Sequence, residues 1–332
     1  MWLGFVFIAC GTGGPDLASS TSDSPGKPQL FGPAEAVAAA DLNGDGFDEE
    51  ILVRSGVVHW SGGEEAIDCT VQVTSRRTVG TGGREEALLG CGAGRETRYA
   101  PARILAVGEK GISTLWSRDG ERNQFSDLRV LNNEIWVAVF SSKFQVEAGW
   151  IREGAFEVVS EGRLATQQYP LAGGQVLQGR VYGEAPRSPG DLRVVGSKKV
   201  RVLPTWRGVR SLQVADLNED SRPELLVGDG WHYAYAEQAR ARLLLLEGPD
   251  WEVGRTMAFF PDDYSVRSIQ VLEEGVLAVG TRHAHWLIRD ELGWSSTTIA
   301  ELSETDLATV MTTREGPGVL VSGSPARWVP IP

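Results

Sequence analysis

Three features of the sequence predict an all-β protein with the architecture of a β-propeller. Short apolar runs alternate with turns rich in Gly, Asp, Asn, Ser and Pro, and no long stretch has the period of a helix. A pair of strand-like segments recurs along the chain. Two acidic loops, at 41–49 and 216–224, each lead directly into an apolar run. These patterns predict a series of small antiparallel sheets without a helical layer.

The composition limits both size and partners. The chain has 332 residues, 42% of them hydrophobic, which is enough for one large domain or two smaller ones. The formal net charge is −12, and the acidic residues are spread along the chain. A nucleic-acid-binding protein needs basic stripes that neutralise phosphates, and the sequence has none. We therefore expect no nucleic-acid partner.

The N-terminus has the features of a processing signal. Residues 1–10 are mostly apolar and end in Cys10, and they are too few for a bilayer span, which needs about 20 residues. Ile8-Ala9-Cys10 resembles the cleavage box of a bacterial lipoprotein, and 11–27 has the composition of a flexible tether. Phe7 stands where Leu is usual, and no Lys or Arg precedes the apolar run. A cytosolic protein with an apolar start, or a wrongly assigned start codon, is the alternative.

If Cys10 carries the lipid, the other two cysteines form an even pair. An exported protein would join Cys69 and Cys91, and closing that loop could add about 3 kcal/mol by restricting the unfolded chain. Two buried free thiols are the alternative. We expect a monomer on the bacterial outer membrane or cell surface, attached to the membrane only through Cys10.

One repeated segment explains the acidic loops. The sequence Val-Arg-Ser-Leu-Gln-Val at 209–214 returns as Val-Arg-Ser-Ile-Gln-Val at 266–271. An acidic loop follows the first copy, whereas only 272–274 separate the second copy from its next apolar run. The acidic loop is therefore interpreted as an insertion in the turn between two paired strands.

The second strand of this pair can be followed through seven units. Its copies are expected at 51–56, 104–108, 135–140, 192–196, 225–228, 276–280 and 319–323. Their nearly continuous apolar character is typical of strands covered on both faces, whereas wetter outer strands are expected at 113–116, 148–150 and 285–288.

Four strands per unit, repeated seven times, predict a seven-bladed β-propeller that fills 28–332 as a single domain. Six or eight blades are the alternatives. The last unit, 306–332, is one strand short, and 27–31 is expected to supply the missing strand.

The acidic loops have the spacing of a hard-cation site. Each places side-chain oxygens at positions 1, 3, 5 and 9, and position 7 adds a backbone carbonyl. An EF-hand is excluded, because its bidentate Glu at position 12 would fall on Leu52 and Val227. The loops resemble the FG-GAP/VCBS repeats, which build the propellers of integrin α-subunits and of many bacterial surface proteins.

The resemblance implies Ca²⁺ binding at one or two sites, for which we predict a structural role. The first consists of Asp41, Asn43, Asp45, Glu49 and the carbonyl of Phe47, and the second of Asp216, Asn218, Asp220, Glu224 and the carbonyl of Arg222. The family usually has Asp at position 9 and Gly at position 6, where the turn favours positive φ; Gly46 fits and Ser221 does not. The expected affinity is in the range of about 10⁻⁴–10⁻³ M. Acidic surface turns that simply stay solvated are the alternative.

Two further groups of residues could carry chemistry. His283 and His285 are two apart in a predicted strand, so they share a face and could chelate a transition metal, but no third ligand has a motif-like spacing. Asp262-Asp263 could be a general acid–base pair. The simpler interpretations are partly exposed strand histidines and a solvated turn between blades.

The function expected is that of a non-enzymatic, calcium-stabilised surface propeller that binds a protein or a glycan. The alternative is a carbohydrate-active enzyme, because some polysaccharide lyases carry similar propellers. Such an enzyme would gather basic and aromatic side chains in one groove, and the candidates are Arg180, Tyr182, Arg187, Arg207 and Tyr233. A scaffold module without a ligand of its own is a third possibility.

Overall fold

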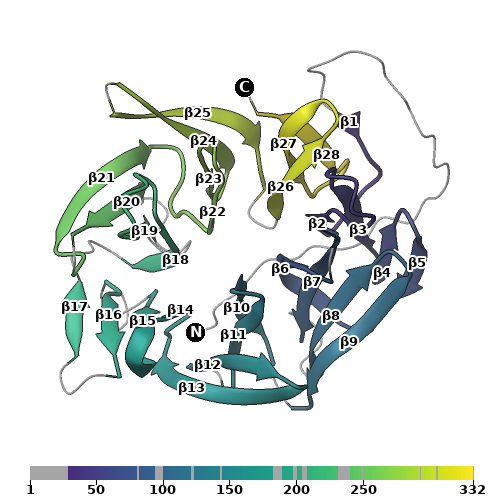
Figure 1. The fold of residues 1–332 in the computed structure, drawn as a ribbon, viewed down its shortest axis with the longest axis horizontal. Coiled ribbons are helices and arrows are strands. Elements are labelled where there is room, and N and C mark those ends of the chain that lie inside the picture. The colour runs from purple at the N-terminus through teal and green to yellow at the C-terminus, as the bar shows by residue number, and fades with distance from the viewer. Residues whose placement is uncertain are drawn as a thin grey trace. The chain divides into compact units, whose positions relative to one another are not determined.

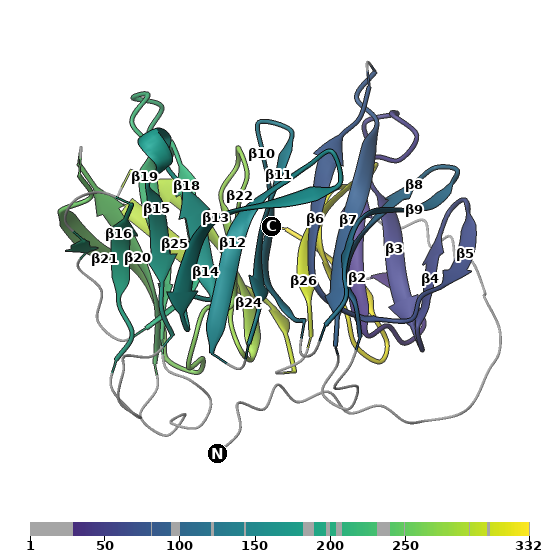
Figure 2. The same ribbon diagram turned by 90° about the horizontal axis from the view of Figure 1, so that it is seen from below.

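The computed structural model contains seven four-stranded antiparallel sheets, the blades of a seven-bladed β-propeller (Figures 1 and 2). This confirms the predicted fold class and the blade number. The structure describes residues 29–80, 82–93, 100–120, 123–142, 144–181, 189–196, 200–203, 208–230, 240–248, 250–291, 293–303 and 306–331. Within these ranges no helix has the length and hydropathy that a membrane span requires.

The chain divides into two compact units. The first comprises the described residues of Met1–Phe125, Arg129–Asn133 and Ser303–Pro332, and the second those of Ser126–Leu128 and Glu134–Leu302. Strand β10 contributes residues to both. The prediction of one domain over 28–332 stays a prediction.

The first unit holds three complete blades. Blade 1 is β2 (Ala36–Ala40), β3 (Glu49–Arg54), β4 (Val57–Trp60) and β5 (Gly63–Ala66). Blade 2 is β6 (Thr70–Thr78), β7 (Glu85–Gly92), β8 (Ala102–Gly108) and β9 (Gly111–Arg118). Blade 7 is β26 (Ala308–Thr313), β27 (Gly316–Val321), β28 (Arg327–Pro330) and β1 (Gln29–Leu30).

The second unit holds most of blade 3 and all of blades 4 to 6. Blade 3 is β10 (Phe125–Leu131), β11 (Glu134–Phe140), β12 (Gln145–Arg152) and β13 (Ala155–Arg163). Blade 4 is β14 (Gln167–Pro170), β15 (Val176–Gly179), β16 (Leu192–Val195) and β17 (Arg201–Leu203), with the short 3-10 turn η1 (Ala172–Gly174) after β14. Blade 5 is β18 (Val209–Ala215), β19 (Glu224–Asp229), β20 (Ala241–Glu247) and β21 (Val253–Phe260). Blade 6 is β22 (Ser268–Val271), β23 (Val276–Val279), β24 (His283–Asp290) and β25 (Gly293–Glu301).

The N-terminal strand completes the last blade as predicted. In β1, Gln29 lies opposite Trp328 and Leu30 opposite Arg327, so the segment adds an outer strand to β28. The blade thus joins residues from both ends of the described chain.

Several strands have a different place in their blade from the one predicted. Five of the seven expected second strands hold that position, but 104–108 is the third strand β8 and 192–196 corresponds to the third strand β16. Second and third strands are both covered on two faces, so their apolar runs look alike in sequence. The predicted outer strand 113–116 lies in β9, whereas 148–150 and 285–288 belong to the third strands β12 and β24.

Two-residue turns with positive φ join several strands. They occur at Ser55-Gly56 between β3 and β4, at Asn132-Asn133 between β10 and β11, and at Glu153-Gly154 between β12 and β13. Positive φ at both turn residues matches the right-handed twist of an antiparallel hairpin. The turn at Asn132-Asn133 is thus a tight hairpin of this kind.

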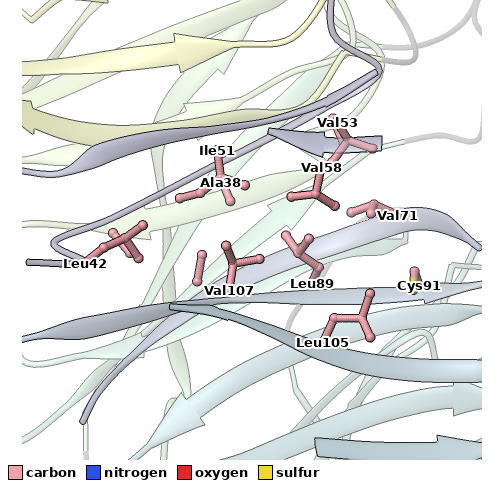
Figure 3. Packing of buried hydrophobic residues seen from close by; sticks show 13 residues of the cluster. Ala38, Leu42, Ile51, Val53, Val58, Val71, Leu89, Cys91, Leu105 and Val107 are labelled. Carbon is pink, nitrogen blue, oxygen red and sulfur yellow. The ribbon is translucent and has the colours of Figure 1, made fainter. Parts of the chain in front are cut away.

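The core of the first unit lies between blades 1 and 2 (Figure 3). It is built from alternating residues of β2, β3, β7 and β8 with Val58 of β4 and Val71 of β6, and it includes Leu42, which is only 2% exposed. Cys91 belongs to this core and forms a disulfide with Cys69, with 5.5 Å between their Cα atoms. The predicted disulfide is confirmed, and it ties β7 to the segment that precedes β6.

Candidate metal sites

Both acidic loops occupy the turn between the first and second strands of a blade. Loop 1 (Asp41–Glu49) joins β2 to β3, and loop 2 (Asp216–Glu224) joins β18 to β19. In each case an Ala at the end of the first strand pairs with the Glu at position 9, as Ala40 with Glu49 and Ala215 with Glu224. The sibling blade 6 has only Leu272–Gly275 at this place, where Leu272 N donates to the carbonyl of Gly275. The loops are therefore insertions in a hairpin turn, as predicted.

In loop 1, the side-chain oxygens at positions 1, 3 and 5 accept hydrogen bonds from backbone N–H groups later in the loop. The bonds run from Gly44 N to Asp41 Oδ1 (2.6 Å), Asp45 N to Asp41 Oδ1 (3.0 Å), Gly46 N to Asp41 Oδ2 (2.8 Å), Asp45 N to Asn43 Oδ1 (2.8 Å) and Phe47 N to Asp45 Oδ1 (3.0 Å). Such side-chain-to-backbone bonds curl a short segment around its own polar groups.

Loop 2 repeats four of these five bonds at the same positions. They run from Asp220 N to Asp216 Oδ1 (3.2 Å), Ser221 N to Asp216 Oδ2 (2.8 Å), Asp220 N to Asn218 Oδ1 (2.9 Å) and Arg222 N to Asp220 Oδ1 (2.8 Å). Two segments 175 residues apart, which differ at positions 4, 6, 7 and 8, thus adopt one hydrogen-bonded conformation.

The Glu at position 9 closes each loop onto its beginning. Glu49 accepts a hydrogen bond from Leu42 N (2.7 Å) and another from Asn43 Nδ2 (2.5 Å). Glu224 accepts the equivalent bonds from Leu217 N (2.7 Å) and Asn218 Nδ2 (2.8 Å). In both loops the Glu side chain thus reaches back across the loop to its second and third residues.

Negative charge is crowded in loop 1. Burial, together with the nearby carboxylates of Asp45 and Asp41, raises the pKa of Glu49, although the hydrogen bond from Leu42 N acts in the opposite direction. Asp41 is 9% exposed, so part of this charge lies away from solvent. A bound divalent cation would relieve this repulsion.

The backbone of both loops requires positive φ at positions 4 and 6. Loop 1 meets this with Gly44 (φ 83°) and Gly46 (φ 89°). Loop 2 adopts the same conformation with non-glycine residues, Glu219 (φ 61°) and Ser221 (φ 64°). Ser221 thus takes the conformation that the turn demands, at a steric cost that Gly46 avoids.

A Leu at position 2 fixes each loop to its core. Leu42 is buried among residues of blades 1 and 2 (Figure 3), and Leu217 packs against the buried cluster that includes Leu226 and Leu243. Position 8 differs: Asp48 accepts from Arg76 Nη1 (3.0 Å) and Thr312 N (2.7 Å), whereas the Pro223 carbonyl accepts from Trp251 Nε1 (2.9 Å). Position 8 of the two loops is therefore held by different kinds of neighbour.

The donor set of both loops fits calcium. All side-chain donors are oxygens, three of the four are carboxylates, and the loop conformation holds them within one nine-residue turn. Hard cations such as Ca²⁺ take oxygen ligands of this kind.

A second group of polar residues is buried in blade 6 and the turn before it. Asp263 Oδ2 lies 3.2 Å from His283 Nδ1 and 2.8 Å from His285 Nε2, and the three ligand atoms all lie within 4.8 Å of one another. Asp263 is 1% exposed and His285 7% exposed, whereas His283 is half-buried. The expectation of a solvated turn at 262–263 is therefore wrong for Asp263, and the expectation of a partly exposed strand residue is wrong for His285.

The other carboxylate oxygen of Asp263, Oδ1, accepts hydrogen bonds from the turn between β23 and β24 and from the first residue of β24. Asp263 Oδ1 accepts from Arg282 N (2.6 Å), Thr281 Oγ1 (3.2 Å) and His283 N (3.2 Å). Burial disfavours the charged carboxylate, but the hydrogen bonds from His285 and Arg282 N outweigh it and lower the pKa of Asp263 to about 2. The close approach depends on Gly280, because a Cβ there would lie 2.3 Å from Asp263 Oδ1.

The sequence contains the histidine pair but no sign of its partner. Asp263 precedes His283 by 20 residues and belongs to the connection between two blades, so no local spacing joins the three residues. The fold brings them together because the connection forms hydrogen bonds with the turn between β23 and β24.

The structure gives little support to a groove formed by the five residues considered for an enzyme. Arg180 is 8% exposed and forms a two-pronged ion pair with Asp191, in which Nε and Nη2 each lie 2.7 Å from a carboxylate oxygen. Tyr182, Arg187, Arg207 and Tyr233 lie outside the described residues, as does Cys10.

Comparisons with known proteins inform the fold alone. Neither the protein-family models nor the curated proteins yield a match. Among solved structures, a chain from the crystal structure of the mitotic checkpoint complex is similar, with a TM-score of 0.55 and 10% identity, covering 99% of this chain and all of that one. The structure of U3-55K is also similar, with a TM-score of 0.51 and 9% identity, covering 93% of this chain and all of that one.

Proposed function

We propose that the chain is a calcium-stabilised β-propeller of the FG-GAP/VCBS type that acts as a binding module on the bacterial cell surface. The single observation that carries the calcium proposal is the equivalence of the two loops. They share their strand register, their side-chain-to-backbone hydrogen bonds and their positive φ at positions 4 and 6. Solvated turns with no common role have no reason to preserve all three.

The role of the ion is structural. In loop 1 the ion would hold Asp41, Asn43 and Asp45 against the carboxylate of Glu49. In loop 2 it would hold the equivalent residues against the carboxylate of Glu224. Because that carboxylate is the first residue of β3 or β19, the ion would fix the start of the strand to the end of its neighbour. We expect weak binding, at about 10⁻⁴–10⁻³ M, as in extracellular modules.

Thermal unfolding of the full chain tests this role. Millimolar calcium should raise the melting temperature relative to excess EDTA, since an ion that binds only the folded state stabilises it. Asp45→Ala and Asp220→Ala should each reduce the shift, and the double variant should abolish it. Glu65→Ala and Glu252→Ala, which remove exposed charges from the outer part of the same blades, serve as controls. An equal shift in wild type and double variant would contradict the proposal.

Export and anchoring are supported by the disulfide. A Cys69–Cys91 bond is typical of an oxidising compartment, which agrees with a lipoprotein attached through Cys10. Replacing Cys10 with Ser should release the protein from the membrane fraction of the native host. Unchanged membrane retention would defeat the anchor.

The partner proposed is a protein or a glycan bound at the cell surface. The support is the resemblance of the acidic loops to those of surface propellers, together with an acidic chain that lacks phosphate-binding stripes. The lyase alternative receives no support from Arg180, since its guanidinium is occupied by Asp191. A glycan array together with pull-down from the native envelope would identify the partner, and cleavage of an arrayed polysaccharide would instead establish the enzyme.

A further inference from the structure

We propose that Asp263, His283 and His285 form a binding site for one divalent transition-metal ion of the zinc class. The site is separate from the acidic loops and goes beyond the proposed function. Two imidazoles and one carboxylate are a common protein ligand set for such ions, with solvent in the remaining position.

The spacing of the three ligand atoms suits a single ion. Asp263 Oδ2 lies 3.2 Å from His283 Nδ1 and 2.8 Å from His285 Nε2. Ligands bound at about 2.0–2.1 Å in a tetrahedron lie roughly 3.3 Å from one another. The two separations from Asp263 Oδ2 are slightly shorter, and all three ligand atoms lie within 4.8 Å of one another, so small side-chain shifts would admit the ion.

The surroundings orient each ligand. Thr298 Oγ1 lies 3.2 Å from His285 Nδ1, where it can accept a hydrogen bond from Nδ1–H and leave Nε2 free to bind metal. Phe260 stacks on the His285 ring at a centroid distance of 4.1 Å and an angle of 17°. Asp263 Oδ1 is held by Arg282 N, which leaves Oδ2 facing the two imidazoles.

Without metal, the same atoms can form a hydrogen-bonded cluster in which each imidazole donates its ring proton to Asp263 Oδ2. A metal ion would replace these two N–H groups, and each imidazole would then bind it through the nitrogen that faces Asp263 Oδ2 and carry a proton on its other nitrogen. For His285 this tautomer is favoured because Thr298 Oγ1 is in place to accept a hydrogen bond from Nδ1–H. The cluster therefore exchanges two hydrogen bonds for two metal bonds without rearranging the strand.

Access and rigidity also agree with a site. The side chain of Asp263 is fully buried and that of His285 is 9% exposed, whereas the side chain of His283 is 23% exposed. An ion can thus enter beside His283 and keep a water ligand there. The ligands lie on β24 and on a turn that Gly280 allows to pack closely, so little ordering is needed on binding.

Metal titration of the full chain tests the site, with calcium present throughout to saturate the loops. We expect one Zn²⁺ per chain by calorimetry, and visible absorption bands when Co²⁺ is used as the probe. His283→Ala removes one of the three ligands, at a half-buried position, and should weaken Zn²⁺ binding by about 100-fold or more. Circular dichroism establishes that the variant is folded, and Asp263→Asn provides a second test with the side-chain size retained.

His59→Ala is the matched control. His59 Nδ1 lies 3.2 Å from Glu64 Oε2 on the surface of blade 1, which makes a His–carboxylate contact with only two ligands. This variant should bind Zn²⁺ like the wild type. Absence of Zn²⁺ and Co²⁺ binding in a folded wild-type chain would overturn the proposal, as would undiminished binding by folded His283→Ala. Either result would leave the calcium-dependent shift in melting temperature untouched, so the two proposals fail separately.

Discussion

At the scale of single residues, the two acidic loops differ in which residue types occupy the positions of positive φ, although they share their hydrogen bonds. Loop 1 uses Gly44 and Gly46 where φ is positive, and loop 2 uses Glu219 and Ser221. A side chain in this region costs about 1–2 kcal/mol relative to glycine before the entropy of the unfolded chain is considered. Loop 2 is therefore the more strained version of the same turn.

Ser221→Gly should stabilise the protein by about 0.5–1 kcal/mol, since relief of the steric cost exceeds the added entropy of the unfolded chain. Gly46→Ser should have the opposite effect, and it isolates the conformational cost because no atom lies within 4 Å of the added Cβ. Gly44→Ala should cost more, because its Cβ would lie 2.9 Å from the Gly82 carbonyl. Urea unfolding measures all three, and a destabilising Ser221→Gly would contradict the assigned turn.

A second prediction at this scale concerns the ion pairs of Asp191 with Arg180 and Arg193. Burial acts to raise the pKa of Asp191, but hydrogen bonds from Arg180 and Arg193 outweigh it and lower the pKa. A carboxyl group whose pKa is lower in the folded state than in the unfolded state stabilises the fold at pH values above its unfolded pKa, about 3.9. This contribution is lost as the pH falls.

Asp191→Asn should therefore cost about 2 kcal/mol at neutral pH, and the difference from wild type should shrink steadily below about pH 4. Glu134→Gln is the control, because Glu134 also pairs with an Arg, at 2.7 Å from Arg152 Nε, but on the exposed surface. Its effect should be small at every pH. A pH-independent deficit for Asp191→Asn, measured by denaturant unfolding, would exclude the ion pair as its cause.

The histidine cluster shows what residue patterns cannot predict. His283 and His285 share a face in any strand, and this much was visible in sequence. Whether they bind anything depends on Asp263, whose position follows from the path of a connection between blades. Long-range placement of that kind has no local signature.

At the scale of elements, the repeat predicts strands well and their order within a blade less well. The acidic insertions, the turn at Asn132-Asn133 and the strand supplied by the N-terminal segment all follow from local residue types. The hydrophobic pattern puts β8 and β16 in the wrong position within their blades because second and third strands are both rich in apolar residues. Such a pattern indicates burial, and both inner strands are at least half buried.

The disulfide is an element-scale restraint that links β7 to the segment before β6. Replacing both Cys69 and Cys91 with Ser should lower the free energy of unfolding by about 3 kcal/mol, because the unfolded chain regains the entropy of a loop with a sequence separation of 22. Denaturant unfolding under oxidising conditions measures the loss. If reduction of the wild-type protein leaves its stability unchanged, the bond does not restrain the unfolded chain as expected.

At the scale of the whole molecule, the fold was predictable because the same unit occurs seven times. Errors in one blade do not disturb the inference from the others, so the class and blade number emerge correctly even where single strands are misplaced. The partner is different, since recognition belongs to particular side chains that a repeat does not specify. Sequence identities of 9–10% with solved propellers inform the architecture and not the ligand.

Calcium is the claim on which the account of the whole molecule depends, and calorimetric titration tests it most directly. The full chain should bind two Ca²⁺ ions, Asp45→Ala and Asp220→Ala should each bind one, and the double variant should bind none. Variants Glu65→Ala and Glu252→Ala should retain both ions. A wild-type chain that binds no calcium at millimolar concentration, or a double variant that binds as the wild type does, would contradict the assignment of the loops.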